Sequence, residues 1–191
     1  TRTARRCLVV GDLPFGSYQV SVEQTMAAAT RYLKEAAVHA VKLEGLWPDR
    51  VQALVRSGIP VMGHLGLTPQ SIYKFGTYAV RAKEEAEADK LMEDAKLLEE
   101  TGCFAIILEK VPAKLAAKVA KELTIPVIGI GAGAGVDGQV LVMQDMLGIT
   151  QEFNPRFLRR YADLSSIISE ATRQYIKDVK DISFPNEDEQ Y

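Results

Sequence analysis

The chain has 191 residues, of which 47% are apolar and 25% are charged, and its formal net charge is −2. This length suits one domain, and this composition suits a protein with a buried core. A nucleic-acid-binding protein normally has a basic stripe, whereas the one local basic cluster here is Arg2, Arg5 and Arg6. We therefore expect no nucleic-acid partner. No apolar run approaches the roughly 18 residues of a membrane span, so no membrane partner is expected.

The two cysteines, Cys7 and Cys103, are far apart and outside any CxxC pair. Each opens an apolar run, and we expect both to be buried small hydrophobic residues. Structural zinc and redox chemistry are therefore not expected, and a reducing, cytoplasmic location fits.

Short apolar runs alternate with longer amphipathic stretches in the first half of the chain. Ser21 with Gln24 three residues later is typical of a helix start, and Pro48 and Gly58 suit a first helical turn and a helix end. In chain order we expect a strand at Cys7–Val10, a helix at Val22–Glu35, a strand at Ala40–Glu44, a helix at Pro48–Ser57, a strand at Ile59–Gly63 and a loop with at most a short helix at His64–Tyr78.

The second half continues the alternation with longer helices. Leu91, Ala95 and Leu98 recur at helical spacing in a charged stretch that Gly102 ends. In chain order we expect a helix at Arg81–Glu100, a strand at Phe104–Leu108, a helix at Pro112–Leu123, strands at Ile125–Ile130 and Val140–Met143, a helix at Pro155–Lys180 and a loose acidic end at Asn186–Tyr191.

Strands that alternate with helices predict an α/β fold with a parallel sheet. Two architectures fit, an open doubly wound sheet and a closed barrel. The polar residues favour the barrel, because they follow five different strands, whereas an open sheet concentrates its ligands at one switch point. These positions are Asp12, Glu44, His64, Glu109 and the glycines from 129 onward.

A closed (β/α)8 TIM-type barrel needs eight strands, and the pattern supplies six. Eight units take about 250 residues, so each takes roughly 30. We therefore expect residues 1–191 to form a single barrel domain that lacks its N-terminal first two βα units, with 186–191 as a loose acidic tail.

The stretch around Lys42 and Glu44 combines apolar and charged residues on one strand. Alternate side chains share a face, so these two should point into the barrel, while Val41 and Leu43 pack under the helices. The pair is either a structural ion pair or a metal or anion site, and its place at the strand's exit favours function. Asp12 is either a turn cap or a second oxygen ligand, and two such carboxylates suit Mg²⁺.

Two further residues are candidates for chemistry. Glu109 ends a very apolar strand, where partial desolvation suits a general base, although pairing with Lys110 is the structural alternative. His64, just past a strand, is a secondary candidate for substrate contact. His39 lies at the opposite, N-terminal face and receives no function.

The glycines at 133, 135 and 138 satisfy a GxGxxG pattern. A dinucleotide fingerprint must open a helix, whereas Gln139–Met143 has the pattern of a strand. We expect instead a tight loop whose backbone comes close to a ligand.

Six stretches of the chain together resemble the ketopantoate hydroxymethyltransferase family. GHLGLTPQS (63–71) and IPVIGIGAG (125–133) are long enough to be highly specific. The matching stretches are Asp12–Phe15, Val41–Gly45, Gly63–Ser71, Leu108–Glu109 with Val111–Pro112, Ile125–Gly133 and Asp137–Val142.

The resemblance implies transfer of a hydroxymethyl group from 5,10-methylenetetrahydrofolate to 3-methyl-2-oxobutanoate, giving ketopantoate on the route to pantothenate and coenzyme A. It implies Mg²⁺ at Asp12 and Glu44, substrate contacts at Asp12 and Lys42, and Glu109 as the catalytic base; His64 is our added candidate for substrate contact. The family is typically a large homo-oligomer, often a decamer.

The chain departs from the family pattern at several points. The family has an Asp-Ser pair at the end of an earlier barrel strand, and none precedes Cys7. Leu46 and Trp47 stand where the family often has a second glycine, and Thr77 and Arg81-Ala82 differ from its glycine-containing loop.

Two alternatives to the active enzyme remain open. The first is that the chain is an inactive fragment or variant of this enzyme. The second is that it is another magnesium barrel, of the isocitrate lyase and phosphoenolpyruvate mutase group. That group characteristically uses a reactive loop cysteine, for which we expect no counterpart here.

Overall fold

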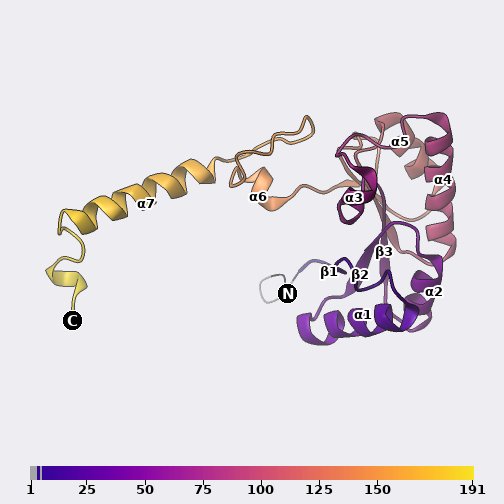
Figure 1. Ribbon diagram of the computed structural model, residues 1–191, viewed down its shortest axis with the longest axis horizontal. Coiled ribbons are helices and arrows are strands. Elements are labelled where there is room, and N and C mark those ends of the chain that lie inside the picture. The colour runs from indigo at the N-terminus through magenta and orange to yellow at the C-terminus, as the bar shows by residue number, and fades with distance from the viewer. Residues whose placement is uncertain (1–3, 5) are drawn as a thin grey trace. The chain divides into compact units, whose positions relative to one another are not determined.

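The computed structural model describes residue 4 and residues 6–191 (Figure 1). The chain divides into two compact units, of which the first ends at Val140 and the second runs from Leu141 to Tyr191. Every strand assigned within the described residues lies in the first unit. The single barrel domain over residues 1–191 stays a proposal.

The first unit contains a six-stranded sheet in which every neighbouring pair is parallel. Its strands follow one another in chain order, as consecutive units of a (β/α)8 barrel do, whereas a doubly wound sheet reverses its order at the switch point. The predicted fold class, a partial TIM-type barrel, is confirmed. The strands are β1 (Val10–Asp12), β2 (Ala40–Glu44), β3 (Val61–Gly66), β4 (Ala105–Glu109), β5 (Val127–Ile130) and β6 (Gly138–Gln139).

Helices connect these strands and lie along one side of the sheet in Figure 1. The Ser21 hydroxyl accepts a hydrogen bond from Gln24 N at 3.2 Å, and Pro48 stands in the first turn of its helix, as the sequence indicates. The segments are α1 (Val22–Ala36), α2 (Pro48–Arg56), the 3₁₀ turn η1 (Pro69–Ser71), α3 (Ile72–Phe75), α4 (Glu85–Glu100) and α5 (Ala113–Glu122).

One face of the sheet is apolar and the other carries charged side chains. Successive side chains of a strand point to opposite faces, so residues of the two kinds that alternate along a strand are separated. Val41, Leu43, Ile106 and Leu108 belong to one buried apolar cluster that also includes residues of the helices. Lys42 and Glu44, which alternate with Val41 and Leu43, contact each other instead. The predicted division between apolar and charged pairs on this strand is therefore confirmed.

Several strand boundaries differ from the sequence-based prediction, by the most at β1, β3 and the sixth strand. β1 begins at Val10 rather than Cys7, and Cys7 is exposed in a bend, so its predicted burial is wrong. β3 runs to Gly66, which places His64 inside the strand instead of after it. The sixth strand is Gly138–Gln139, because its ladder with β5 ends before Val140, and a strand at 140–143 is wrong.

The second unit consists of a short helix, a long helix and a final turn: α6 (Met143–Met146), α7 (Leu164–Lys180) and η2 (Glu187–Glu189). The long helix begins at Leu164 rather than Pro155, because the Asp163 carboxylate caps it by accepting from Ser166 N at 3.2 Å. The acidic end contains a capping box at Asn186 and Glu189.

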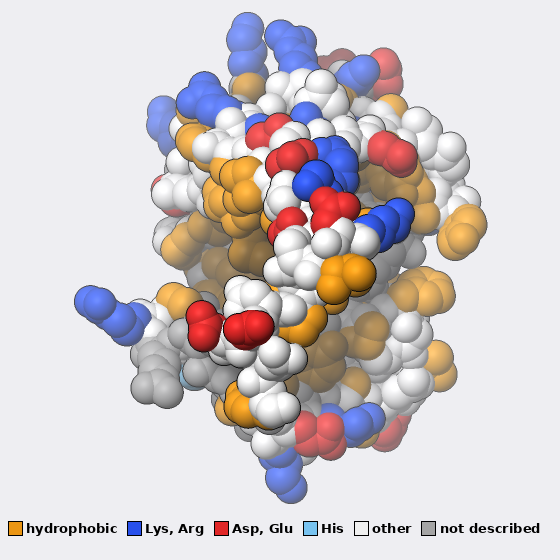
Figure 2. Space-filling model, turned by 90° about the vertical axis from the view of Figure 1, so that its left-hand side faces the viewer, with side chains coloured by type: hydrophobic (Ala, Val, Ile, Leu, Met, Phe, Trp, Pro, Cys, Tyr) orange, Lys and Arg blue, Asp and Glu red, His pale blue; other side chains and the backbone are white. Residues whose placement is uncertain are grey.

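Apolar side chains remain exposed along the long helix, where no residue is buried. Its exposed apolar residues are Ile167, Ile168, Tyr175, Ile176 and Val179. On the face drawn in Figure 2, Lys and Arg side chains are interspersed with Asp and Glu, and hydrophobic side chains reach the surface among them. None of the helices in the described part of the chain is long and apolar enough to cross a membrane.

Replacing Ile106 by alanine tests the core of the first unit. Ile106 is fully buried on β4, so Ile106→Ala should lower the free energy of unfolding by about 2–5 kcal/mol. Urea denaturation followed by circular dichroism measures this change. Val20→Ala, at a side chain that is 71% exposed, serves as the control and should change it by less than about 0.5 kcal/mol.

Candidate active site

The sheet register gathers the predicted site residues on one face. Asp12 is the register partner of Lys42, and Glu44 is the register partner of His64. Glu109 pairs with Gly66, two residues beyond His64 on the same strand. Residues that are far apart in the chain thus become neighbours across four parallel strands.

The Lys42 ammonium is the centre of this polar cluster. Its Nζ lies 2.8 Å from Asp12 Oδ1, 3.6 Å from Glu44 Oε1 and 3.3 Å from His64 Nδ1. The Lys42 side chain is 12% exposed and the Glu44 side chain 5%, whereas Asp12 is 54% exposed. One largely buried cation therefore offsets two carboxylates, of which only Asp12 is open to solvent.

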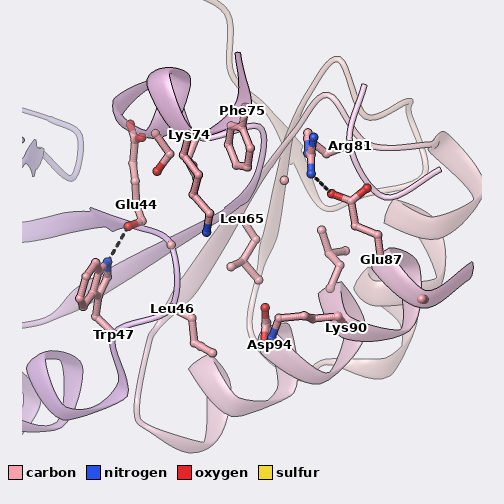
Figure 3. Close-up of a pocket in the computed structure, with 16 residues that line it drawn as sticks. Glu44, Leu46, Trp47, Leu65, Lys74, Phe75, Arg81, Glu87, Lys90 and Asp94 are labelled. Atoms are coloured by element: carbon pink, nitrogen blue, oxygen red, sulfur yellow. Dashed lines mark hydrogen bonds and ion pairs between the residues drawn. The ribbon is translucent and has the colours of Figure 1, made fainter. Parts of the chain in front are cut away.

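Glu44 is held by the loops that surround it. Its Oε2 accepts a hydrogen bond from Gln70 N at 2.8 Å, and its carbonyl oxygen accepts one from Trp47 Nε1 at 2.9 Å, as Figure 3 shows for Trp47. Its own backbone N–H donates to the Tyr18 hydroxyl at 3.2 Å. These contacts fix the carboxylate beside Lys42.

Tyr18 and Gln70 link the connections after β1 and β3 next to this carboxylate. The fully buried Tyr18 hydroxyl donates to Gln70 Oε1 at 2.7 Å, and Gln70 Nε2 donates to the Leu13 carbonyl at 2.9 Å. Burial raises the pKa of Tyr18 to about 12. Sequence reasoning missed both residues: Gln70 lies within the GHLGLTPQS string and could have been singled out, but Tyr18 has no motif around it.

His64 connects the Lys42 cluster to Glu109. An ammonium can only donate, so His64 Nδ1 accepts from Lys42, and the proton of the neutral ring lies on Nε2. This Nε2 is 3.4 Å from Glu109 Oε2 and, within the described residues, forms no hydrogen bond despite being buried. A buried donor without an acceptor next to Glu109 is a position at which a bound molecule could be contacted.

A pocket of about 830 Å³ adjoins this cluster and shares Glu44 with it (Figure 3). Its walls come from the β2–α2 loop, the end of β3, α3 and the first half of α4. They include the apolar side chains of Leu46, Trp47, Leu65, Phe75 and Leu91 and the charged side chains of Lys74, Arg81, Glu87, Lys90 and Asp94.

Comparison of the chain with known proteins identifies its family. A family model described as ketopantoate hydroxymethyltransferase matches residues 1–187. The chain belongs to this family.

Similar proteins carry the name 3-methyl-2-oxobutanoate hydroxymethyltransferase. The chain is 64% identical to those of Christiangramia forsetii and Parabacteroides distasonis, covering 100% of this chain and 71% and 70% of the relatives. It is 60% identical to that of Flavobacterium johnsoniae, of which it covers 71%. The chain is therefore an enzyme of the transferase class.

A likeness to a solved structure does not alter this assignment. The chain matches a phosphoenolpyruvate phosphomutase from Streptomyces platensis at 13% identity and a TM-score of 0.48, over 90% of this chain and 61% of that one. This similarity is too low to support an argument about function.

The family resemblance implies a magnesium ion, and the residues present supply suitable donors. Asp12 and Glu44 bring carboxylate oxygens from adjacent strands to the same ammonium. Mg²⁺ typically takes one or two protein carboxylates together with waters and substrate oxygens, so this donor set fits. Among residue 4 and residues 6–191, no group of three or more His, Cys, Asp and Glu side chains could hold a metal.

The glycine-rich loop of the family motif packs closely against a helix. A Cβ atom at Gly133, where φ is +81°, would lie 2.4 Å from the Ala113 Cβ, and one at Gly135 would lie 2.8 Å from that of Ala117. The predicted tight loop is present, but its glycines are needed for the close approach to α5. The expectation of a ligand at this backbone stays a prediction.

The pH dependence of stability tests the buried Tyr18 hydroxyl. Tyr18→Phe should lower the free energy of unfolding at pH 8 by about 1–3 kcal/mol, because the Glu44 N–H and Gln70 Oε1 lose their partner. Tyr18 ionises near pH 10 when unfolded and near 12 when folded, so its contribution is intact below pH 10 and is lost as pH rises towards 12. Urea denaturation should show the difference between the two proteins shrinking between pH 10 and 11; a constant difference would contradict the assignment.

Proposed function

We propose that this protein transfers a hydroxymethyl group from 5,10-methylenetetrahydrofolate to 3-methyl-2-oxobutanoate, giving ketopantoate for pantothenate and coenzyme A synthesis. The observation that carries the proposal is the polar cluster of Lys42, Glu44, His64 and Glu109 on one sheet face of a chain in this family. A cytoplasmic location and Mg²⁺ dependence are part of the proposal.

Lys42 would bind the anionic end of the 2-oxo acid. Its ammonium lies next to the solvent-exposed Asp12, so an entering carboxylate or developing oxyanion can reach it. Mg²⁺, held through Asp12 and Glu44, would supply Lewis-acid polarisation of the 2-oxo group when bound. Gln70 and Lys42 hold the Glu44 carboxylate in place for this role.

Glu109 would be the base that removes the C3 proton. Its side chain is 16% exposed at the end of an apolar strand, where a carboxylate is poorly solvated and a substrate can replace water. His64 Nε2 faces it and would donate to bound substrate, which supports its predicted contact.

The reaction balances with one molecule of water. The C3–H bond breaks and its proton passes to Glu109, while the electron pair remains on the substrate as an enolate. C3 then bonds to the one-carbon unit as both C–N bonds that hold this unit on the folate break, and a water oxygen becomes the hydroxyl group. Of the two protons of water and the proton on Glu109, one stays on the hydroxyl group and two go to the folate nitrogens, so tetrahydrofolate leaves. Lys42 and the groups around it would stabilise the negative charge on the enolate oxygen.

Neither cysteine supports the isocitrate lyase and phosphoenolpyruvate mutase alternative. Cys103 is buried before β4, and burial raises the pKa of its thiol to about 12, so it remains protonated. Cys7 lies in a bend before β1, ahead of the strand's carboxyl end, where site residues gather.

A homo-oligomer, often a decamer in the family, is also proposed. The apolar residues exposed along α7 support this part of the proposal, because exposed apolar surfaces are typical of protein–protein contacts.

Proton NMR of 3-methyl-2-oxobutanoate in D₂O tests the proposal directly. Loss of the C3 proton signal with protein and Mg²⁺ is the expected result, since enolisation exchanges that proton with solvent. Absence of exchange at any Mg²⁺ concentration would favour the inactive-fragment alternative and refute the proposed activity of this chain.

Glu109→Gln should abolish C3 exchange, with a rate reduced by at least about 100-fold, because an amide cannot accept the proton. Binding of the 2-oxo acid, measured by calorimetry, should change little. Glu100→Gln is the matched control, since Glu100 is an exposed carboxylate at the end of α4. Exchange at the parent rate in Glu109→Gln would remove this residue as the base.

Glu44→Gln should raise the Mg²⁺ concentration needed for half-maximal C3 exchange by about 10- to 100-fold. The amide oxygen can still accept from Gln70 N, so the loop should stay in place while one carboxylate charge is lost. Circular dichroism provides the control for folding. An unchanged Mg²⁺ titration would contradict a metal role for Glu44.

A further inference from the structure

The pocket beside Glu44 is larger than the proposed 2-oxo acid requires. At about 830 Å³ it lies in the range of roughly 300–1,000 Å³ that accommodates drug-sized ligands, whereas the 2-oxo acid has only a few heavy atoms. The polar cluster already offers that acid a cation and a base. The pocket therefore has room for a second, larger molecule.

Aromatic and aliphatic side chains form part of the pocket wall. Trp47 is fixed at the start of α2 by its hydrogen bond to the Glu44 carbonyl, and Phe75 lies at the end of α3. Leu46 and Leu65 contribute further apolar surface (Figure 3). Such walls suit a flat, partly apolar ligand, because aromatic rings pack well against flat surfaces.

Charged side chains complete the wall, and two of its three cations, Arg81 and Lys90, are paired with carboxylates. Arg81 pairs with Glu87 and also lies over the Phe75 ring, with its guanidinium carbon 4.4 Å from the ring centre. Lys90 pairs with Asp94 at 3.0 Å. Lys74 points into the pocket and forms no ion pair within the described residues, so its ammonium is free for a ligand carboxylate (Figure 3).

We propose that this pocket binds the one-carbon donor, a reduced folate, with Lys74 contacting a carboxylate of its glutamate tail. This inference rests on the proposed function and locates its second substrate. A folate combines a flat ring system with an anionic tail, which matches the apolar and cationic parts of the wall. Because Glu44 borders both pocket and polar cluster, the two substrates would lie next to each other, as direct carbon transfer requires.

Tetrahydrofolate binding, measured by isothermal titration calorimetry, tests the pocket. Lys74→Ala should weaken binding about fivefold and Lys74→Glu more, because a cation facing the carboxylate is lost or reversed. Tyr73→Ala is the matched control: Tyr73 precedes Lys74 on α3 and its side chain is 99% exposed, so binding should not change. Trp47 is the only tryptophan of the chain and lines the pocket, so its fluorescence should change when tetrahydrofolate binds to the unaltered protein.

A second variant blocks the pocket instead of changing its charge. Ala86 lies on the surface of α4 and lines the pocket, so Ala86→Phe should fill it without disturbing the core. Tetrahydrofolate affinity should fall at least tenfold. The C3 exchange of 3-methyl-2-oxobutanoate, which needs no folate, should stay at the parent rate.

These measurements separate failure of the pocket from failure of the proposed function. Unchanged tetrahydrofolate affinity in both Lys74→Glu and Ala86→Phe would overturn the pocket assignment, as would the absence of binding to the parent protein. Loss of C3 exchange in Ala86→Phe would place the 2-oxo acid here and also overturn it. Absence of exchange in the parent protein would instead count against the proposed activity.

Discussion

The arrangement of the site depends on one largely buried cation. Lys42 lies between the carboxylates of Asp12 and Glu44, and Glu44 is almost completely removed from water. A carboxylate so placed is strongly unfavourable unless a cation and hydrogen-bond donors compensate it, and here Lys42 and the Gln70 N–H do so. The interaction joins adjacent strands at the sheet face where parallel strands present their functional residues.

The solvent exposure of the site residues differs across this face of the sheet. Asp12 is the exposed edge of the cluster, whereas His64 is buried and connects Lys42 to Glu109. A small anion could therefore approach near Asp12 while its reacting carbon reached Glu109 in a drier region, where electrostatic interactions are stronger. Val41, Leu43, Ile106 and Leu108, on the opposite face, belong to one buried apolar cluster, and this close-packed cluster is a rigid support for the chemistry.

The connections after β1 and β3 are tied to the end of β2 at Glu44. Gln70 contacts Leu13, Tyr18 and Glu44, so the connection after β3 cannot move without disturbing the loop after β1 and the end of β2. The pocket beyond Glu44 is built from that same loop together with α3 and α4. The hydrogen bonds that hold the carboxylate thus also shape the proposed folate pocket, so the two substrate sites share one structural support.

The sequence by itself determined the α/β alternation, the extent of β2 and the types of residue at the strand ends, because these follow from local periodicity, capping and turn chemistry. It also carried the family motifs. The ends of β3 and β6 could not be predicted, since a strand ends where its neighbour's ladder ends. Tertiary structure alone decided that His64 faces Glu109 and that Tyr18 meets Gln70. Contacts between residues this distant in sequence depend on register and loop packing, which no local pattern encodes.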